Sequence, residues 1–315
     1  MALGIHPELL HILGGSGTKR AGPPIGDIDD RRKNLSEGFA ALADSGDAVS
    51  GVDRCDSSTV TDDGAGLRLS WYQDATTEPP GSAVLYLHGG GFIVSLLPAY
   101  DRMMRAYVRA TGVPMLLVDY RVAPEHPHPT PVEDCYAALC WLADSATELG
   151  VDPKRIGVMG ESAGGGLAAG VALMARDRRG PSVAQQMLFY AMLDDRTVRP
   201  DPELPSEYLV FTYDDNQTGW GALLGPARQG EEVPPYAAPA RASDLSGLPA
   251  TYIDVGDIDI LRDENIDYAR RLMTAGVPTE LHVVPGLPHG FDMVAPEALV
   301  TKRVIANRLR RLASL

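Results

Sequence analysis

Ile156-Gly-Val-Met-Gly-Glu-Ser-Ala-Gly-Gly165 is the stretch of sequence that decides the fold. Its first four residues, 156–159, are a short apolar run of the kind that forms a buried strand. The next five, 160–164, read Gly-x-Ser-x-Gly, and a helix is predicted from about Gly164 onward. A sharp turn from strand to helix needs glycine on both sides of the serine, because a Cβ atom there would clash. Strand, turn and helix in this order predict that Ser162 is an exposed nucleophile.

A second glycine-rich stretch, His88-Gly-Gly-Gly-Phe92, follows the predicted strand 83–87, and its first residue precedes Ser162 by 74 residues. A serine that attacks a carbonyl group needs N–H donors aimed at the oxyanion that forms there. Because glycines let the main chain approach a substrate closely, this loop is predicted to supply such donors. The two glycine-rich turns support each other, since both follow strands of the same predicted sheet.

The general base is expected to be one of seven histidines. His289, in Gly286-Leu-Pro-His-Gly-Phe291, follows the last predicted strand, from which it could reach Ser162. The others lie before the sheet, in the glycine-rich loop, among prolines or inside the last strand. They are His6, His11, His88, His126, His128 and His282. His289 is therefore the predicted base.

The acid that orients this histidine should follow the preceding strand, which begins at Ala250. Of the four aspartates nearby, Asp254 lies within or at the end of that strand, and Asp263 fits the first turn of the next helix. Asp257 and Asp259 are left as alternatives. The order serine, aspartate, histidine along the chain is that of the α/β-hydrolases.

From about residue 65 onward, short β-rich runs alternate with helical segments, which is the pattern of a mostly parallel sheet covered by helices. The period-two stretch 67–72 predicts a half-exposed edge strand. Continuous apolar runs predict buried strands at 83–87 and 115–118, and the runs 156–159, 187–190, 250–253 and 281–284 continue the series. Helices are predicted at 99–111, 132–149, 164–178, 263–275 and 296–312.

Two regions do not follow this alternation: residues 1–50 and the polar, proline-rich insertion 195–238. Together they are predicted to form a cap over a catalytic domain made of residues 51–194 and 239–315. The insertion is rich in aromatic residues, which form its own small core or line the substrate pocket. The residues assigned to substrate binding are Phe92, Tyr208, Phe211 and Trp220.

Several motifs make the sequence resemble the hormone-sensitive-lipase-like branch of the α/β-hydrolases, which includes many bacterial carboxylesterases. The likeness extends from about residue 80 to residue 292. In that family the acidic motif is usually Asp-Pro-Leu, and aligning it here selects Asp259, with Ile260 at the place of the proline. The motifs are His88-Gly-Gly-Gly91, Asp119-Tyr-Arg-Val-Ala-Pro-Glu-His-Pro127 with Pro131-Val-Glu-Asp134, Gly160-Glu-Ser-Ala-Gly-Gly165, Gly256-Asp-Ile-Asp-Ile-Leu-Arg-Asp263 and His289-Gly-Phe291.

The resemblance implies an α/β-hydrolase fold, with an eight-stranded, mostly parallel sheet covered by helices and a helical cap. Its implied activity is that of a serine carboxylesterase, which hydrolyses small, short-acyl esters through an acyl-enzyme and needs no cofactor or metal. The implied catalytic residues are Ser162, Asp259 and His289. The implied oxyanion donors are Gly90, Gly91 and Ala163. The alternatives are hydrolysis of amides, lactones or carbamates by the same residues, and a non-catalytic small-molecule receptor.

Length, charge and cysteine content narrow the function classes. The 315-residue chain has a formal net charge of −14, so it would repel the phosphates of a nucleic acid, and no such partner is expected. The longest wholly apolar stretch, 164–175, is too short to cross a membrane and is predicted to be a buried helix. Three cysteines without paired spacing predict a cytoplasmic location. The expected partner is a small ester, with a homodimer as the assembly to be tested.

Overall fold

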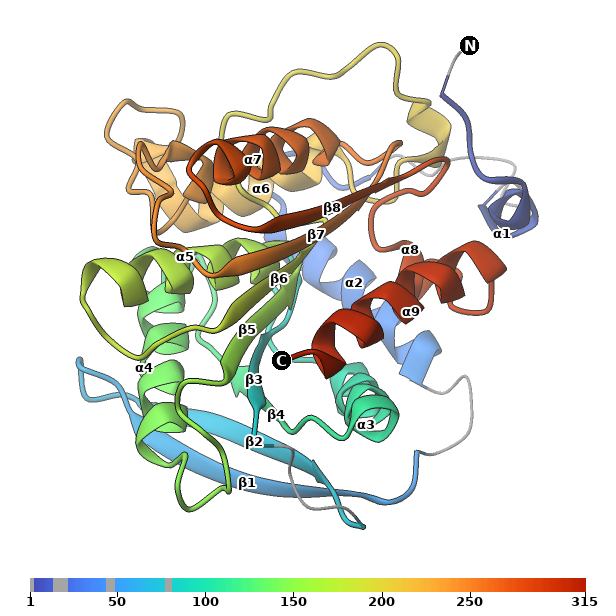
Figure 1. Cartoon of the computed structure of the whole chain (residues 1–315). Helices are drawn as coiled ribbons and strands as arrows, with labels where there is room; N and C mark the ends of the chain where they lie inside the picture. The colour runs from blue at the N-terminus through green and yellow to red at the C-terminus, as the bar shows by residue number, and fades with distance from the viewer. Residues whose placement is uncertain (1–2, 14–21, 44–48, 77–80) are drawn as a thin grey trace.

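An eight-stranded sheet is the scaffold of the computed structural model, which describes residues 3–13, 22–43, 49–76 and 81–315. The strands of this described part are β1 (Val52–Val60), β2 (Gly66–Asp74), β3 (Ala83–Leu87), β4 (Met115–Asp119), β5 (Ile156–Glu161), β6 (Gln185–Phe189), β7 (Ala250–Gly256) and β8 (Thr279–Val284). Their spatial order is β1-β2-β4-β3-β5-β6-β7-β8 (Figure 1). β2 is antiparallel to β1 and β4, and the other neighbouring pairs are parallel. The predicted mostly parallel sheet is therefore confirmed.

The edge of the sheet differs from the sequence-based prediction. Residues 67–72 belong to β2, which is an inner strand between β1 and β4. β1 is the edge strand, and it pairs with β2 from Val52 opposite Asp74 to Val60 opposite Gly66. Most side chains of β1 are exposed, so its sequence lacks the apolar run or regular alternation that would predict a strand.

Helices cover both faces of the sheet. They are α3 (Ala99–Thr111), α4 (Thr130–Asp144), α5 (Ala163–Asp177), α7 (Arg262–Thr274) and α9 (Leu299–Ala313). Each was predicted, but α4 ends before residue 149 and α9 begins after residue 296. Figure 1 shows α3 and α9 on one side of the sheet, with α4 and α5 on the other.

Side chains of the strands contribute to two buried hydrophobic cores, one on each face of the sheet. In β3, Leu85 and Leu87 belong to the core that includes α4, α5 and α7. Val84 and Tyr86, which alternate with them, belong to the core that includes α3 and α9. This alternation follows from the pleat of a strand, which points successive side chains to opposite faces. Both faces of the central strands are therefore apolar, as the continuous apolar runs predicted.

The apolar stretch at the start of α5 is part of this core. Residues 163–175 of α5 are all buried, which confirms the prediction of a buried helix. In the described ranges, none of the helices combines the length and the apolarity that a membrane crossing requires.

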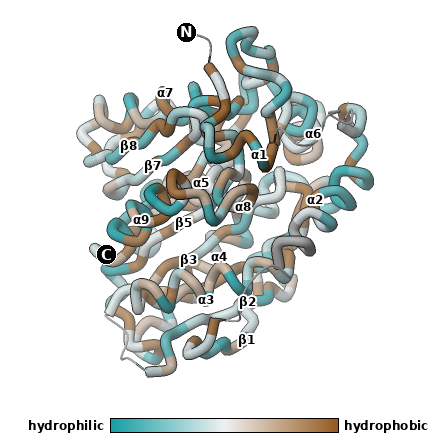
Figure 2. Tube along the Cα trace, turned by 90° about the vertical axis from the view of Figure 1, so that its right-hand side faces the viewer, coloured by the Kyte–Doolittle hydropathy of each residue, from teal (hydrophilic) through white to brown (hydrophobic). Residues whose placement is uncertain are grey.

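Two helices lie outside the α/β alternation, α2 (Ile28–Ala43) and α6 (Tyr213–Leu224), and an ion pair joins them. The Gly26 N–H group donates to Thr218 Oγ1 at 2.9 Å, and Arg31 Nε donates to Asp215 Oδ1 at 2.8 Å. Figure 2 shows both helices on the same side of the molecule. The remaining short helices are η1 (Pro7–Leu9), α1 (Leu10–Leu13), η2 (Ser206–Tyr208), η3 (Gly225–Ala227), η4 (Pro239–Arg241) and α8 (Phe291–Val294).

Candidate active site

Ser162 lies in a turn that requires glycine neighbours. It connects β5 to α5 with φ of 53° and ψ of −122°, a backbone conformation that residues with a side chain rarely adopt. A Cβ atom on Gly160 would lie 2.3 Å from the Gly164 oxygen, and one on Gly164 would lie 2.1 Å from the Leu87 oxygen. Both distances are far below van der Waals contact. Glycine at these two positions therefore allows the turn that presents Ser162 beyond the carboxyl end of β5.

Three side chains from separate loops meet at the carboxyl edge of the sheet. Ser162 follows β5, Asp259 follows β7 and His289 follows β8. His289 Nδ1 is 2.7 Å from Asp259 Oδ2, and His289 Nε2 is 2.9 Å from Ser162 Oγ. Because an ionised carboxylate only accepts hydrogen bonds, Nδ1–H donates to Asp259, and Nε2 is left to accept from the serine hydroxyl. This arrangement can activate a serine for attack on a carbonyl carbon.

The structure distinguishes the two aspartates that the sequence leaves as alternatives. Asp259 is 1% exposed, and its second oxygen, Oδ1, accepts the N–H group of Leu261 at 2.9 Å. Its orientation toward His289 is thus held by the main chain. Asp257 instead accepts the N–H group of Gly286 at 2.6 Å and ties together the loops after β7 and β8. Asp259 is therefore the aspartate that contacts the histidine.

The glycine-rich loop after β3 also reaches this edge. Gly90 and Gly91 have φ angles of +117° and +60°, and a Cβ atom on Gly90 would lie 2.8 Å from the Cβ of Val94. The Gly90 oxygen accepts the N–H groups of Ile93 and Val94, both at 3.1 Å, which closes a tight turn. In the described part of the chain, no hydrogen bond takes up the N–H groups of Gly90 and Gly91. These two groups are available to a ligand beside Ser162.

A cavity of about 340 Å³ opens beside Ser162 and His289. Most of the other side chains in its wall are apolar. Both predicted cap regions contribute to this wall, through Asn34, Leu35, Gly38, Val210 and Phe211. A second cavity of about 340 Å³ adjoins the first, with which it shares Leu35, Val210, Phe211 and the glycines at 90 and 91. The site therefore offers a small apolar space on the side of the glycine-rich loop.

Of the four side chains predicted to bind substrate, only Phe211 lines the cavity beside Ser162. Its ring stacks on His289, with ring centroids 4.8 Å apart. Phe92 and Trp220 are 1% and 0% exposed, and their rings pack together at 4.9 Å. Tyr208 packs against the same core. Phe92 and Trp220 are thus buried in the hydrophobic core and Tyr208 is partly buried against it. These three residues do not line the cavity beside Ser162, which corrects the prediction for them.

Sequence reasoning missed Glu161 and Tyr100, which also line the cavity. Glu161 is 1% exposed, and burial raises the pKa of its carboxyl group to about 8. Its Oε1 atom lies 2.6 Å from the Tyr100 hydroxyl group. A glutamate at the end of an otherwise apolar strand was the signal that could have identified it.

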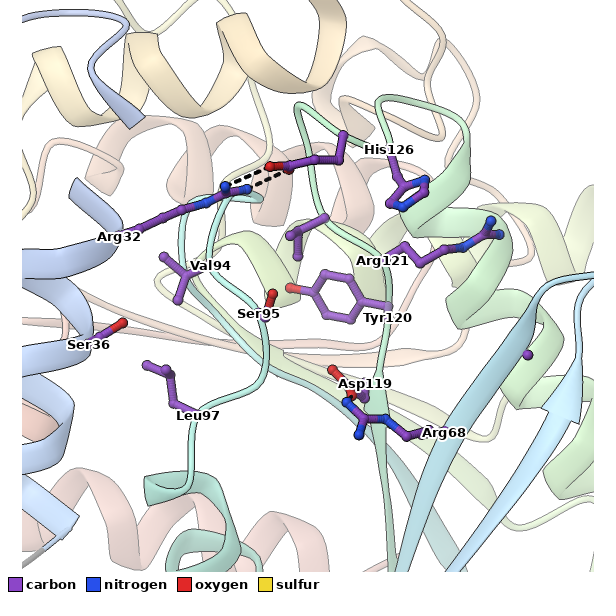
Figure 3. Close-up of a pocket in the computed structure, with 13 residues that line it drawn as sticks. Arg32, Ser36, Arg68, Val94, Ser95, Leu97, Asp119, Tyr120, Arg121 and His126 are labelled. Carbon is purple, nitrogen blue, oxygen red and sulfur yellow. Dashed lines mark hydrogen bonds and ion pairs between the residues drawn. The ribbon is translucent and has the colours of Figure 1, made fainter. Parts of the chain in front are cut away.

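A larger cavity, of about 550 Å³, is lined in part by Val94, Ser95 and Leu97 of the loop that follows β3 (Figure 3). Figure 3 shows Arg32 reaching from α2 toward a carboxylate, that of Glu125, which it contacts at 2.6 Å. The other arginines of the wall are paired as well, as Arg68–Asp119 and Arg121–Asp134. The cavity thus has no unpaired arginine to attract an anion. Across the residues that the structure describes, no three His, Cys, Asp or Glu side chains are grouped to hold a metal ion.

Comparisons with known proteins agree with this fold. A family model for the alpha/beta hydrolase fold matches residues 84–293. The chain is 38% identical to Esterase LipI of Mycobacterium tuberculosis over 232 residues, which cover 72% of this chain and 70% of the relative. It is 32% identical to an ethyl acetate hydrolase of Pseudomonas putida over 270 residues, 84% of this chain and 83% of the relative. Among solved structures, a bacterial heroin esterase superposes with a TM-score of 0.88 at 36% identity, over 98% of this chain and 97% of that one.

Proposed function

This chain belongs to the hormone-sensitive-lipase-like branch of the alpha/beta hydrolase fold family and is a carboxylic ester hydrolase, in which we propose that three side chains perform the hydrolysis. They are Ser162, His289 and Asp259. The observation that carries this proposal is the pair of hydrogen bonds that links the three side chains, at 2.7 and 2.9 Å. A serine, a base and an orienting acid in that order form the minimal machinery for acyl transfer.

In the first half of the reaction, Ser162 Oγ attacks the ester carbonyl carbon while His289 Nε2 takes the hydroxyl proton. Asp259 keeps Nδ1 protonated and stabilises the imidazolium that forms. The carbonyl oxygen becomes an oxyanion that accepts the N–H groups of Gly90, Gly91 and Ala163. When the tetrahedral intermediate collapses, His289 returns the proton to the departing alkoxide and the acyl-enzyme is left.

In the second half, a water molecule repeats the attack on the acyl-enzyme. His289 takes the proton of the water, the oxyanion forms in the same place, and Ser162 leaves with the proton that His289 returns. The products are a carboxylic acid and an alcohol. Every proton thus passes through one imidazole, so no cofactor takes part in the scheme.

The size and lining of the cavity favour small esters with short acyl groups. A cavity of about 340 Å³ is at the lower end of the range of roughly 300 to 1,000 Å³ for small-molecule sites, and its apolar wall favours an uncharged group. A relative with 32% identity is named for ethyl acetate, which is such an ester.

The cap assignment, residues 1–50 and 195–238, is also a proposal, over a catalytic domain of residues 51–194 and 239–315. It is supported by two hydrogen bonds to α6, one from Gly26 and one from Arg31 on α2, and by the cavity wall, to which both regions contribute. Residues 1–2, 14–21 and 44–48 of the first region lie outside the described residues.

A cytoplasmic location is proposed because Cys55, Cys135 and Cys140 are all free thiols. The homodimer stays a prediction, which light scattering coupled to size-exclusion chromatography would test. The net charge of −14 still argues against a nucleic-acid partner.

The decisive test is hydrolysis of p-nitrophenyl esters of increasing acyl length by the wild type and by Ser162→Ala. Loss of the nucleophile should lower kcat by about 10⁴ to 10⁶. Ser95→Ala is the matched control, because this exposed serine lies near the glycine-rich loop but lines the other cavity. A Ser162→Ala variant that keeps a tenth of the wild-type activity, with the same circular dichroism spectrum, would overturn the assignment.

A further inference from the structure

A buried carboxyl group lies directly behind the glycine-rich loop. Glu161 Oε1 accepts the N–H group of Gly89 at 2.8 Å and the hydroxyl group of Tyr100 at 2.6 Å. The Gly89 N–H group also lies 3.1 Å from the Tyr100 oxygen, so the three groups form a closed hydrogen-bonded cluster. Gly89 is bonded through its peptide group to Gly90, the first proposed oxyanion donor.

The cluster leaves the start of the loop little freedom to move. A Cβ atom on Gly89 would lie 3.2 Å from both the main-chain oxygen and Oε1 of Glu161, so the loop is packed closely against this residue. On its other side, His88 stacks on Tyr120 with ring centroids 4.2 Å apart. The Tyr120 hydroxyl group donates to the His88 oxygen at 2.6 Å. Residues 88 and 89 are therefore held between two buried polar contacts.

The hydrogen bonds of Glu161 point to the loop and not to an ion pair. Its Oε2 atom is buried and has no hydrogen-bond partner among the described residues. Two charged groups influence the pKa of the Glu161 carboxyl group in opposite directions: Asp292 on α8 raises it, and Arg308 on α9 lowers it. A buried carboxyl group with an unpartnered oxygen lowers the stability of a fold, so a structural role explains it poorly.

We infer that Glu161 is a positioning residue of the esterase: it holds Gly89, and through it the N–H groups of Gly90 and Gly91, where the oxyanion forms. This inference rests on the proposed function of those two glycines. Oxyanion donors stabilise charge that exists only in the transition state, so their placement affects kcat far more than the binding of substrate. Loss of the anchor should therefore lower kcat and leave KM nearly unchanged.

Three substitutions of Glu161 distinguish the role of its hydrogen-bond acceptor from the role of its charge. Glu161→Ala removes the acceptor, and Glu161→Asp withdraws it by one methylene group while keeping a carboxylate. Both should lower kcat for p-nitrophenyl acetate by about 10- to 100-fold, with KM within about twofold, because a displaced donor costs less than the 10² to 10³ of a deleted one. Glu161→Gln retains an oxygen that can accept from Gly89, so it should restore kcat to within about threefold of the wild type.

Affinity for a trifluoromethyl ketone should follow kcat in this series, because its serine adduct carries the same oxyanion. The matched control is Glu264→Ala. Glu264 is also a buried carboxyl group that accepts two main-chain N–H groups, those of Leu193 at 2.7 Å and Asp194 at 3.2 Å, but its hydrogen-bond partners among the described residues do not belong to the glycine-rich loop. Its loss should lower the melting temperature and leave kcat per folded molecule unchanged.

The inference is overturned if folded Glu161→Ala or Glu161→Asp keeps kcat within twofold of the wild type, or if the glutamine variant is as slow as the alanine variant. If Glu161→Ala does not fold, the aspartate and glutamine variants decide the matter alone. Failure of the proposed function would look different, because wild-type turnover would then persist in Ser162→Ala.

Discussion

At the scale of single residues, the acid is the assignment that one substitution tests most sharply. Asp259→Asn should lower kcat/KM by about 10³ to 10⁴, because the amide no longer fixes the tautomer of His289 or stabilises its charged form. Asp257→Asn should change it by less than about threefold, since the side-chain oxygen can still accept from Gly286. Steady-state kinetics on one short-chain ester, with both variants side by side, measure the difference. The reverse ranking would assign the role to Asp257.

The burial of Glu161 predicts how the free energy of unfolding depends on pH. Burial raises its pKa to about 8 from the ordinary 4.5, so the folded protein holds this proton over a range in which the unfolded chain has released it. The stabilisation this provides is complete below pH 4.5 and is lost as the pH rises through 8. Glu161→Gln holds no such proton. The wild type should therefore lose stability relative to this variant as the pH rises.

Urea unfolding of the two proteins at about pH 5, 7 and 9 measures this change. Other buried acids titrate equally in both proteins, so they cancel in the difference between the two free energies of unfolding. A difference that stays constant across the three pH values would show that Glu161 does not hold a proton in the folded state.

The candidate site shows what could be predicted at this scale and what could not. Ser162 and His289 were predictable because a glycine turn and a loop after the last strand are local patterns. Asp257 and Asp259 are two positions apart in one loop, so only the direction of each side chain shows which of them contacts His289. The hydrogen bond from Gly89 to Glu161 joins residues 72 positions apart, and no local pattern reports such a contact.

At the scale of elements, the insertion before β7 contains two aromatic side chains with different roles. Phe211→Ala should change the ranking of esters by acyl length, because its ring stacks on His289 and forms part of the cavity wall. Trp220→Ala should instead lower the free energy of unfolding by about 3 to 5 kcal/mol, since its indole is fully buried. Turnover of an ester panel and urea unfolding, measured for both variants, test this contrast. Equal scaling of all esters by Phe211→Ala would contradict it.

The same scale explains which elements the sequence pattern identified. The central strands and α5 are buried on all sides, so their sequences are continuously apolar and conspicuous. β1 was not predicted because most of its side chains are exposed, so its sequence has few apolar residues. Only its pairing with β2 identifies it as a strand. Phe92 illustrates a different limit, because its position beside the glycine-rich loop does not reveal that its side chain turns inward toward Trp220.

At the scale of the whole molecule, a buried ion cluster fastens the C-terminal helix to the edge of the sheet that carries the site. Arg308 on α9 is 0% exposed and donates to both oxygens of Asp254 on β7 at 2.7 Å. It also pairs with Asp292, three residues after His289, and its guanidinium group lies 3.8 Å from the ring centroid of Phe189. One side chain thus joins α9, β6, β7 and the segment that follows the histidine.

Arg308→Met should therefore destabilise the entire fold. The variant keeps an apolar side chain of similar length but leaves the buried carboxylate of Asp254 and the partly buried one of Asp292 without their cation. Breaking a comparable buried pair costs about 3 to 5 kcal/mol. Arg310→Met is the control, because Arg310 is 56% exposed and pairs with Glu280 at the surface, where such a pair contributes less than about 1 kcal/mol. Urea unfolding, followed by circular dichroism, measures both changes. If both variants lose the same free energy of unfolding, the buried Arg308 cluster stabilises the fold no more than a surface ion pair does. Packing of α9 alone would then hold the C-terminal helix against the sheet.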